Sequence, residues 1–175
     1  MQDTPEQLPT DLQADNPLWH FALAFWNFPG VESTCLELQR KGWSVTQILS
    51  ACWLTISGQK YIGNESDTVT EWRTHVTGSL RLARQFIPRD DPDTAELRAS
   101  IARNELEAER IELALTYQSL ANARPDNASR QGSEHLARTN LGAAAPEATM
   151  DMETGQLLDA LAKGLASFSS GTSGA

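Results

Sequence analysis

The stretch 16-NPLWHFALAFWNFPGVESTCLELQ-39 decides the fold that we expect for this chain. Asn16 followed by Pro17 is typical of a helix start, because an asparagine side chain caps the first turn and proline loses no hydrogen bond there. Pro29 and Gly30 end this helix at about residue 27. The residues from 31 to 41 carry apolar side chains on one face only. The stretch therefore predicts two short helices that fold back on each other as the first hairpin of a core.

Three more helices are expected further along the chain. Ser44-Val-Thr-Gln47 is a capping box and begins a helix that ends at Gly58. A similar signal begins a helix over residues 68–87, and a longer helix follows over residues 93–123. Apolar residues step by three or four along each of them. The sequence thus predicts an all-α fold, a compact bundle of about five helices with the last one long, followed by a disordered C-terminal tail.

Charge and composition divide the chain into three parts. Residues 1–15 hold four acids and no base, and we expect an acidic flexible N-terminus. Residues 16–124 hold 13 acids and 11 bases and form the expected helical domain. Residues 125–175 are rich in small and polar residues, as disordered tails are. Near 150–168 this tail has an amphipathic patch, which would be a marginal helix alone; its candidate contact residues are Leu157, Leu161, Leu165 and Phe168.

Motifs for catalysis or metal binding are missing from the sequence. The three histidines share no ligand spacing, and neither C-x-x-C, H-E-x-x-H, a glycine-rich phosphate loop nor G-x-S-x-G occurs. We therefore assign no catalytic, metal-binding or cofactor-binding residue and expect no cofactor. An enzyme or small-ligand-binding protein that uses a pocket near Trp19, His20 and Cys35 stays an alternative, although a mid-stripe cysteine is more often inert core.

Arginines follow one face of the expected helix 68–87, opposite its apolar stripe. They are Arg73, Arg81 and Arg84. The plainer interpretation is a solvated face that pairs with acids of the following helix, because surface charge is a weak sign of function. Those acids are Glu105, Glu107, Glu109 and Glu112. The sharper interpretation is a docking face for an acidic partner or for RNA phosphates.

The favoured function is a non-enzymatic protein-interaction module, because contact residues are many and no polar triad converges. Its candidate partner-binding residues are the three arginines together with Trp19 and Trp26. We expect a protein partner of unknown identity, and nucleic acid is disfavoured because residues 16–124 are close to neutral. An RNA-associated protein stays a further alternative. Helix 93–123 carries a second apolar stripe that would allow self-association.

Two features bear on location. Two cysteines are too few for a disulfide framework, and no apolar stretch reaches the length of about 20 residues that a membrane span needs. The N-terminal residues lack the pattern of a secretory signal. We therefore expect a cytoplasmic protein without membrane contact.

Several short motifs occur in a fixed order between residues 16 and 120. In that order they are L-W-x-F-A-L from Leu18, P-G-V from Pro29, C-L-x-L-Q from Cys35, W-R-x-x-V from Trp72, L-R-x-x-R from Leu80 and E-L-x-A-E-R from Glu105. With this set the chain resembles a bacterial family of short, cytosolic, all-helical proteins catalogued as a domain of unknown function. The resemblance implies an all-helical fold and a bacterial cytoplasm, and it implies no activity. The part from residue 124 onward lies outside it.

Overall fold

The structure, a computed structural model, describes residues 8–122, 133–146 and 150–172. These residues contain helices and no strand, which confirms the all-α prediction. The described residues form two compact units: unit 1 comprises residues 8–16 and 65–122, and unit 2 comprises residues 17–64, 133–146 and 150–172. The range 16–124, expected to be one helical domain, is thus divided between the two units. The expected flexible residues 1–7 lie outside the described residues.

Unit 2 begins with the three helices that the sequence predicts. They are α1 (Pro17–Trp26), α2 (Val31–Arg40) and α3 (Val45–Ile56). Gly30 has a φ of 83°, a left-handed conformation that glycine adopts without strain, and it joins α1 to α2 in a tight turn. The Ser44 side chain accepts a hydrogen bond from the Gln47 N–H, as the capping box predicts.

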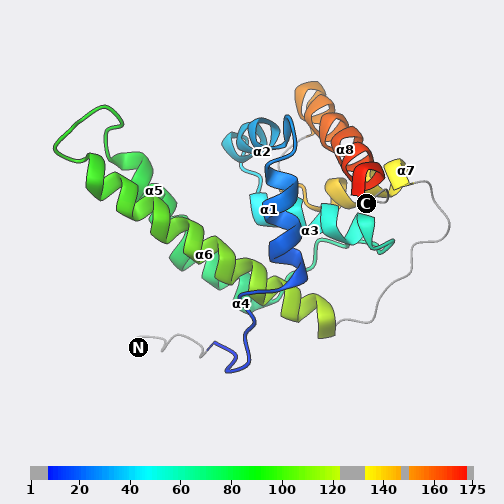
Figure 1. Cartoon of the computed structure of the whole chain (residues 1–175), viewed down its shortest axis with the longest axis horizontal. Helices are drawn as coiled ribbons and strands as arrows, with labels where there is room; N and C mark the ends of the chain where they lie inside the picture. The colour runs from blue at the N-terminus through cyan, green and yellow to red at the C-terminus, as the bar shows by residue number, and fades with distance from the viewer. Residues whose placement is uncertain (1–7, 123–132, 147–149, 173–175) are drawn as a thin grey trace. The chain divides into compact units, whose positions relative to one another are not determined.

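The expected disordered tail is wrong for most of its residues. It contains α7 (Ser133–Ala143) and α8 (Met152–Thr172), which complete unit 2 (Figure 1). α7 packs against α3, and α8 packs against α2 and α7. The buried apolar residues of the two helices are Leu136, Ala137, Leu141, Leu158, Leu161, Ala162 and Leu165. Tertiary packing thus stabilises two helices that would be marginal alone.

Aromatic residues of the first hairpin and of α8 form one cluster in unit 2. The ring of Phe168 lies edge-on to those of Phe21, Phe25 and Phe28, with centroid distances of 5.9, 5.4 and 5.8 Å. Edge-to-face packing at this distance is favourable beyond the burial of area. The three phenylalanines of the first hairpin therefore form a cluster to which α8 supplies the fourth ring.

Asn140 of α7 is a fully buried amide that joins α7 to the chain around the end of α3. Its Oδ1 accepts a hydrogen bond from the Tyr61 N–H at 2.8 Å. Its Nδ2 donates to the Thr55 hydroxyl and to the Gln59 carbonyl, both at 2.9 Å, and lies 3.4 Å from the Ala51 carbonyl. A buried amide with its hydrogen bonds made fixes one arrangement of the elements that it joins.

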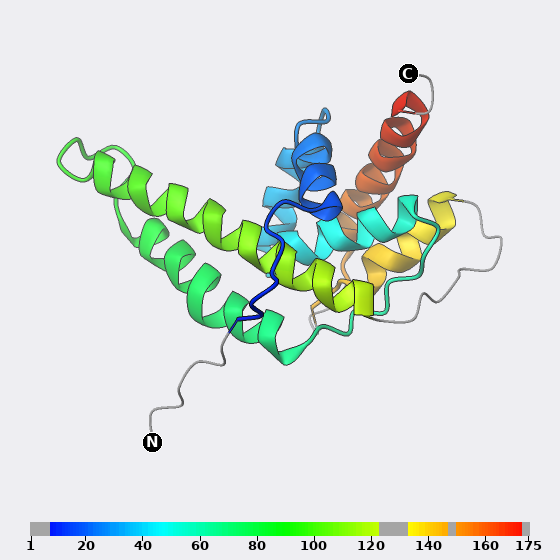
Figure 2. The same ribbon diagram turned by 60° about the horizontal axis from the view of Figure 1, so that its bottom comes forward.

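Unit 1 is built around a long helical hairpin. Its first arm consists of α4 (Asp67–Trp72), the π-helical segment η1 (Arg73–Thr77) and α5 (Gly78–Phe86). Its second arm is α6 (Ala95–Asn122), which lies alongside the first (Figure 2). The long helix is therefore α6 and is not the last, so the expected count of about five helices with the long one last is wrong in this detail.

The π-helical segment replaces the uninterrupted helix predicted over residues 68–87. The Gly78 N–H donates to the Arg73 carbonyl, five residues earlier. A Cβ atom at position 78 would lie 2.9 Å from that same oxygen, closer than real Cβ contacts allow. Glycine therefore permits the wider turn, which rotates the residues after it relative to those before it.

Candidate functional site

The arginine face lies against α6 rather than in solvent. Arg81 donates from Nε to Glu105 at 3.0 Å and from Nη2 to Glu109 at 2.7 Å. Arg84 binds the same Glu105 carboxylate, with its Nη2 at 3.1 Å. Pairing with the acids of the next helix, the plainer of the two sequence interpretations, is therefore what the structure shows. The expectation that the arginines oppose the packing stripe was wrong.

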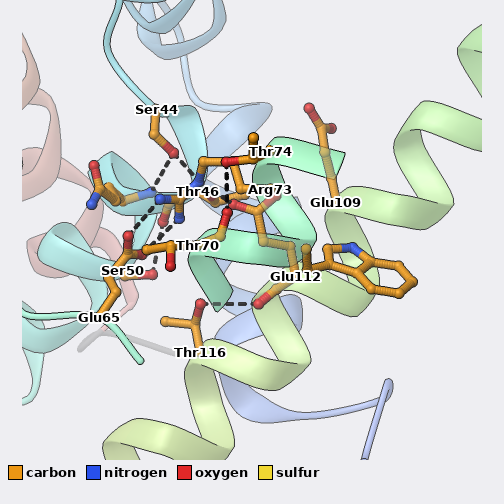
Figure 3. A network of polar contacts seen from close by, with 12 residues as sticks. Ser44, Thr46, Ser50, Glu65, Thr70, Arg73, Thr74, Glu109, Glu112 and Thr116 are labelled. Carbon is orange, nitrogen blue, oxygen red and sulfur yellow. Dashed lines mark hydrogen bonds and ion pairs between the residues drawn. The ribbon is translucent and has the colours of Figure 1, made fainter. Parts of the chain in front are cut away.

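Arg73 makes the most buried of these ion pairs. It binds Glu65 at 2.6 Å from Nη2 and Glu112 at 2.7 Å from Nε, and the Glu112 side chain is 1 % exposed (Figure 3). Burial alone would lower the pKa of Arg73, but the hydrogen bonds and charges of the two glutamates raise that pKa overall. Arg73 is therefore a fixed cation between two carboxylates.

A further arginine binds the carbonyl oxygens at the C-terminal end of α5. Arg98 of α6 donates to the carbonyl oxygens of Arg84 and Ile87, the latter at 3.0 Å. Carbonyls at a helix C-terminus have no partner within the helix, and a cation there also meets the negative end of the helix dipole. Hydrogen bonds of charged groups thus hold α5 to α6 from Arg81 to the C-terminal end of α5.

Surrounding groups shift the pKa values of Glu109 and Arg84, which belong to these arginine–glutamate ion pairs; we call the set of pairs the arginine–glutamate ladder. Burial raises the pKa of Glu109, against the lowering effect of Arg81, and the neighbouring Glu105 raises it further. Hydrogen bonding to Glu105 raises the pKa of Arg84. Four carboxylates and three guanidinium groups therefore share a partly buried strip in which each charge has an opposite neighbour.

The arginines occupy the inner face of α5, and the outer face exposes two large apolar side chains. No residue between Gly78 and Phe86 is buried. Leu82 and Phe86, one helical turn apart, are 69 % and 92 % exposed. We call these two residues the outer pair. Neither residue is among the sequence-predicted contacts, although both are large apolar residues outside the expected apolar stripe of this helix.

The tryptophan, histidine and cysteine candidates differ in exposure. Trp19 and Trp26 are half-buried and His20 is exposed. Cys35 is fully buried, and desolvation raises its pKa to about 12. A thiol with such a pKa is a poor nucleophile near neutral pH. His20 and Cys35 thus lack the shared, accessible setting that a catalytic pair needs.

The tail patch faces the core of unit 2. Leu161 and Leu165 are buried, Leu157 is half-buried, and Phe168 belongs to the aromatic cluster. These side chains therefore pack within the unit.

Neither metal-ligand clusters nor membrane spans occur in the described ranges. No group of three or more histidine, cysteine, aspartate or glutamate residues among residues 8–122, 133–146 and 150–172 could hold a metal ion. None of the helices described there has the length and apolar character that crossing a membrane requires.

The comparison with protein families gives one match. Residues 17–115 match the family described as "Protein of unknown function (DUF2390)", and because the match spans more than half of the chain, the chain belongs to this family. This confirms the resemblance to a family of unknown function. No curated protein and no solved structure matches the chain. α7 and α8 lie outside the matched range.

Proposed function

We propose that this member of the DUF2390 family is a non-enzymatic protein-interaction module and that its partner contacts the outer face of α5. The observation that carries the proposal is the exposure of the outer pair, Leu82 and Phe86, on a helix with no buried residue. Large apolar side chains that gather on one exposed face mark interaction sites more often than isolated ones do.

The spacing of the outer pair suggests how a partner would bind it. Two anchors four residues apart lie on one face of a helix, and such a face fits an apolar groove. The arginine–glutamate ladder fixes the opposite face of α5, so the helix would be presented already formed. Binding to a preformed helix avoids the entropy cost of ordering it. In this proposal Arg73, Arg81 and Arg84 position the contact face and do not touch the partner.

The charges of unit 1 give less support to the RNA alternative. The guanidinium groups of Arg73, Arg81 and Arg84 already bind carboxylates, and their side chains are only 20–22 % exposed. A phosphate would have to displace these buried partners, so no counterion release would favour binding. The expected contacts at Trp19 and Trp26 stay predictions.

The proposal is tested by placing a photo-reactive phenylalanine analogue at position 86 of the full chain and illuminating it in cells. We expect a defined cross-linked protein, and we expect Leu82→Ser to reduce its yield. The matched control carries the analogue at Ile62, which is 65 % exposed and belongs to unit 2. The same products from both positions, or no product from position 86, would contradict the proposal.

Self-association is a separate outcome of the same experiment. A cross-link between two copies of the chain would identify the partner as the protein itself, and sedimentation of the wild type and of Phe86→Ser would then differ. Charge reversal of the arginines is unsuitable as a test, because Arg81→Glu would place a carboxylate against Glu105 and Glu109 and open the hairpin.

A further inference from the structure

A pocket of about 610 Å³ lies between α3, α7 and α8 in unit 2. Ligand pockets in proteins commonly have volumes of about 300–1,000 Å³. Small side chains keep this space open: Ala137 belongs to α7, and Ala162 and Ala166 belong to α8. This open pocket is therefore a candidate site for a ligand.

The walls of the pocket are apolar with hydroxyl groups and carry no charge. Ile56 and Phe168 supply the large apolar surfaces, and Ile56 is 44 % exposed at the end of α3. None of the ten lining residues is an acid, a base or a histidine. A charged group held against this lining would give up hydration without gaining an opposite charge. The lining thus favours neutral groups over carboxylates and ammonium groups.

The hydroxyl groups that line the pocket can accept hydrogen bonds, but few of them are left to donate one. The Ser169 hydroxyl donates to the Leu165 carbonyl and the Ser170 hydroxyl donates to the Ala166 carbonyl, both at 2.9 Å, whereas the Thr55 hydroxyl oxygen already accepts from Asn140. Both serine protons are thus engaged within α8. A bound molecule would match this lining best with a hydroxyl or amide N–H that donates.

From this geometry we propose that the pocket binds a neutral, mainly apolar molecule that carries a hydroxyl or amide group. The site differs from the pocket near Trp19, His20 and Cys35 that the sequence suggested, because none of these residues lines it. It also differs from the outer pair, which belongs to unit 1. The ligand site and the protein contact therefore stand on independent observations.

Binding is tested on the full chain with N-phenyl-1-naphthylamine, a neutral probe whose fluorescence rises in apolar sites. We expect a saturable signal that 1-decanol displaces. Decanoate and decylammonium have the same chain with a negative or a positive end, and we expect them to compete at least about tenfold less well. Equal competition by all three molecules would indicate an unspecific amphiphile surface and overturn the proposal, as would the lack of a saturable signal.

Filling the pocket gives a second, structural test. Ala166→Leu and, separately, Ala137→Leu place a larger side chain in the space from two different helices. At least one of them is expected to retain the helical circular dichroism and the melting temperature of the wild type while its probe affinity falls about tenfold or more. The matched control is Ala160→Leu, at an exposed position of α8 that does not line the pocket. Unchanged probe affinity in the folded filling variants would refute the site.

Discussion

Replacing Asn140 by alanine removes the buried amide that joins α7 to the rest of unit 2. The Tyr61 N–H then loses its acceptor in a place that water does not reach. The Thr55 hydroxyl oxygen and the Gln59 carbonyl lose their donor at the same time. The substitution would thus remove the buried side-chain hydrogen bonds that Asn140 makes to the residues around the end of α3.

The expected loss of stability is about 3–5 kcal/mol. An unsatisfied buried N–H costs about 1–3 kcal/mol, and the two acceptors add a smaller amount each. The space left by the removed amide group adds a cavity cost of about 1 kcal/mol. This sum is a large part of the stability of about 5–15 kcal/mol that single domains have. At a typical urea dependence of about 2 kcal/mol per M, the unfolding midpoint would fall by about 2 M.

Urea unfolding followed by tryptophan fluorescence reports on the stability of unit 2. Four of the five tryptophans belong to unit 2, and Trp72→Phe removes the one in unit 1. In this background the control is Asn64→Ala, because Asn64 is an exposed asparagine of unit 2 and its loss should change stability by no more than about 0.5 kcal/mol. A loss below about 1 kcal/mol for Asn140→Ala would refute the reasoning, since α7 would then not be docked through this amide.

Three further predictions concern the C-terminal helices and the hairpin. Deletion of residues 123–175 should lower the melting temperature of the tryptophan signal strongly, because it removes α7 and α8 from the core of unit 2; an unchanged melting temperature would show that they do not contribute. Hydrogen bonding to the Thr154 side chain and N–H, with help from Lys41, lowers the pKa of Asp151 to about 2, so its contribution to stability is present above about pH 4 and is lost as the pH falls toward 2. The melting-temperature difference between wild type and Asp151→Asn should therefore be present at pH 7 and shrink over that range, and a difference independent of pH would contradict the assignment. Gly78→Ala should destabilise by about 1 kcal/mol or more because its Cβ would lie 2.9 Å from a carbonyl oxygen, whereas Gly155→Ala, with open space around it, should stabilise by about 0.5–1 kcal/mol, both measured in urea unfolding of the wild-type background followed by circular dichroism.

Trp53→Ala is expected to destabilise the protein less than the sequence alone predicts. The sequence places Trp53 in the central helix and predicts a loss of about 3–5 kcal/mol for Trp53→Ala, as for a large buried aromatic residue. The structure confirms α3 but leaves Trp53 half-buried. The fully buried aromatic residue nearby is Phe25, and Trp43 is buried as well. The expected cost for Trp53→Ala is therefore smaller, because only the buried part of the ring loses contacts.

Local sequence signals are sufficient to predict the ends of α1, α2 and α3. The proline at position 17, the glycine at position 30 and the Ser44 cap act within a few residues of the chain, so the sequence alone locates these helix ends. The same signals fail at Gly78, since a capping box and an apolar period do not reveal a π turn. They also fail for α7, whose buried face combines two leucines with an alanine and an asparagine.

By itself the sequence determined that the chain is helical, where most helices begin, and that Arg73, Arg81 and Arg84 share one face with acids available on the next helix. Only the tertiary structure decided which way that face points, and that α7 and α8 are part of a core. The physical reason is the range of the interactions. Capping and periodicity link neighbours in the chain, whereas Asn140 meets Tyr61 across 79 residues and Arg73 meets Glu112 across 39. Such pairs form only when the fold brings the helices together, and they decide which side chains are left for a partner.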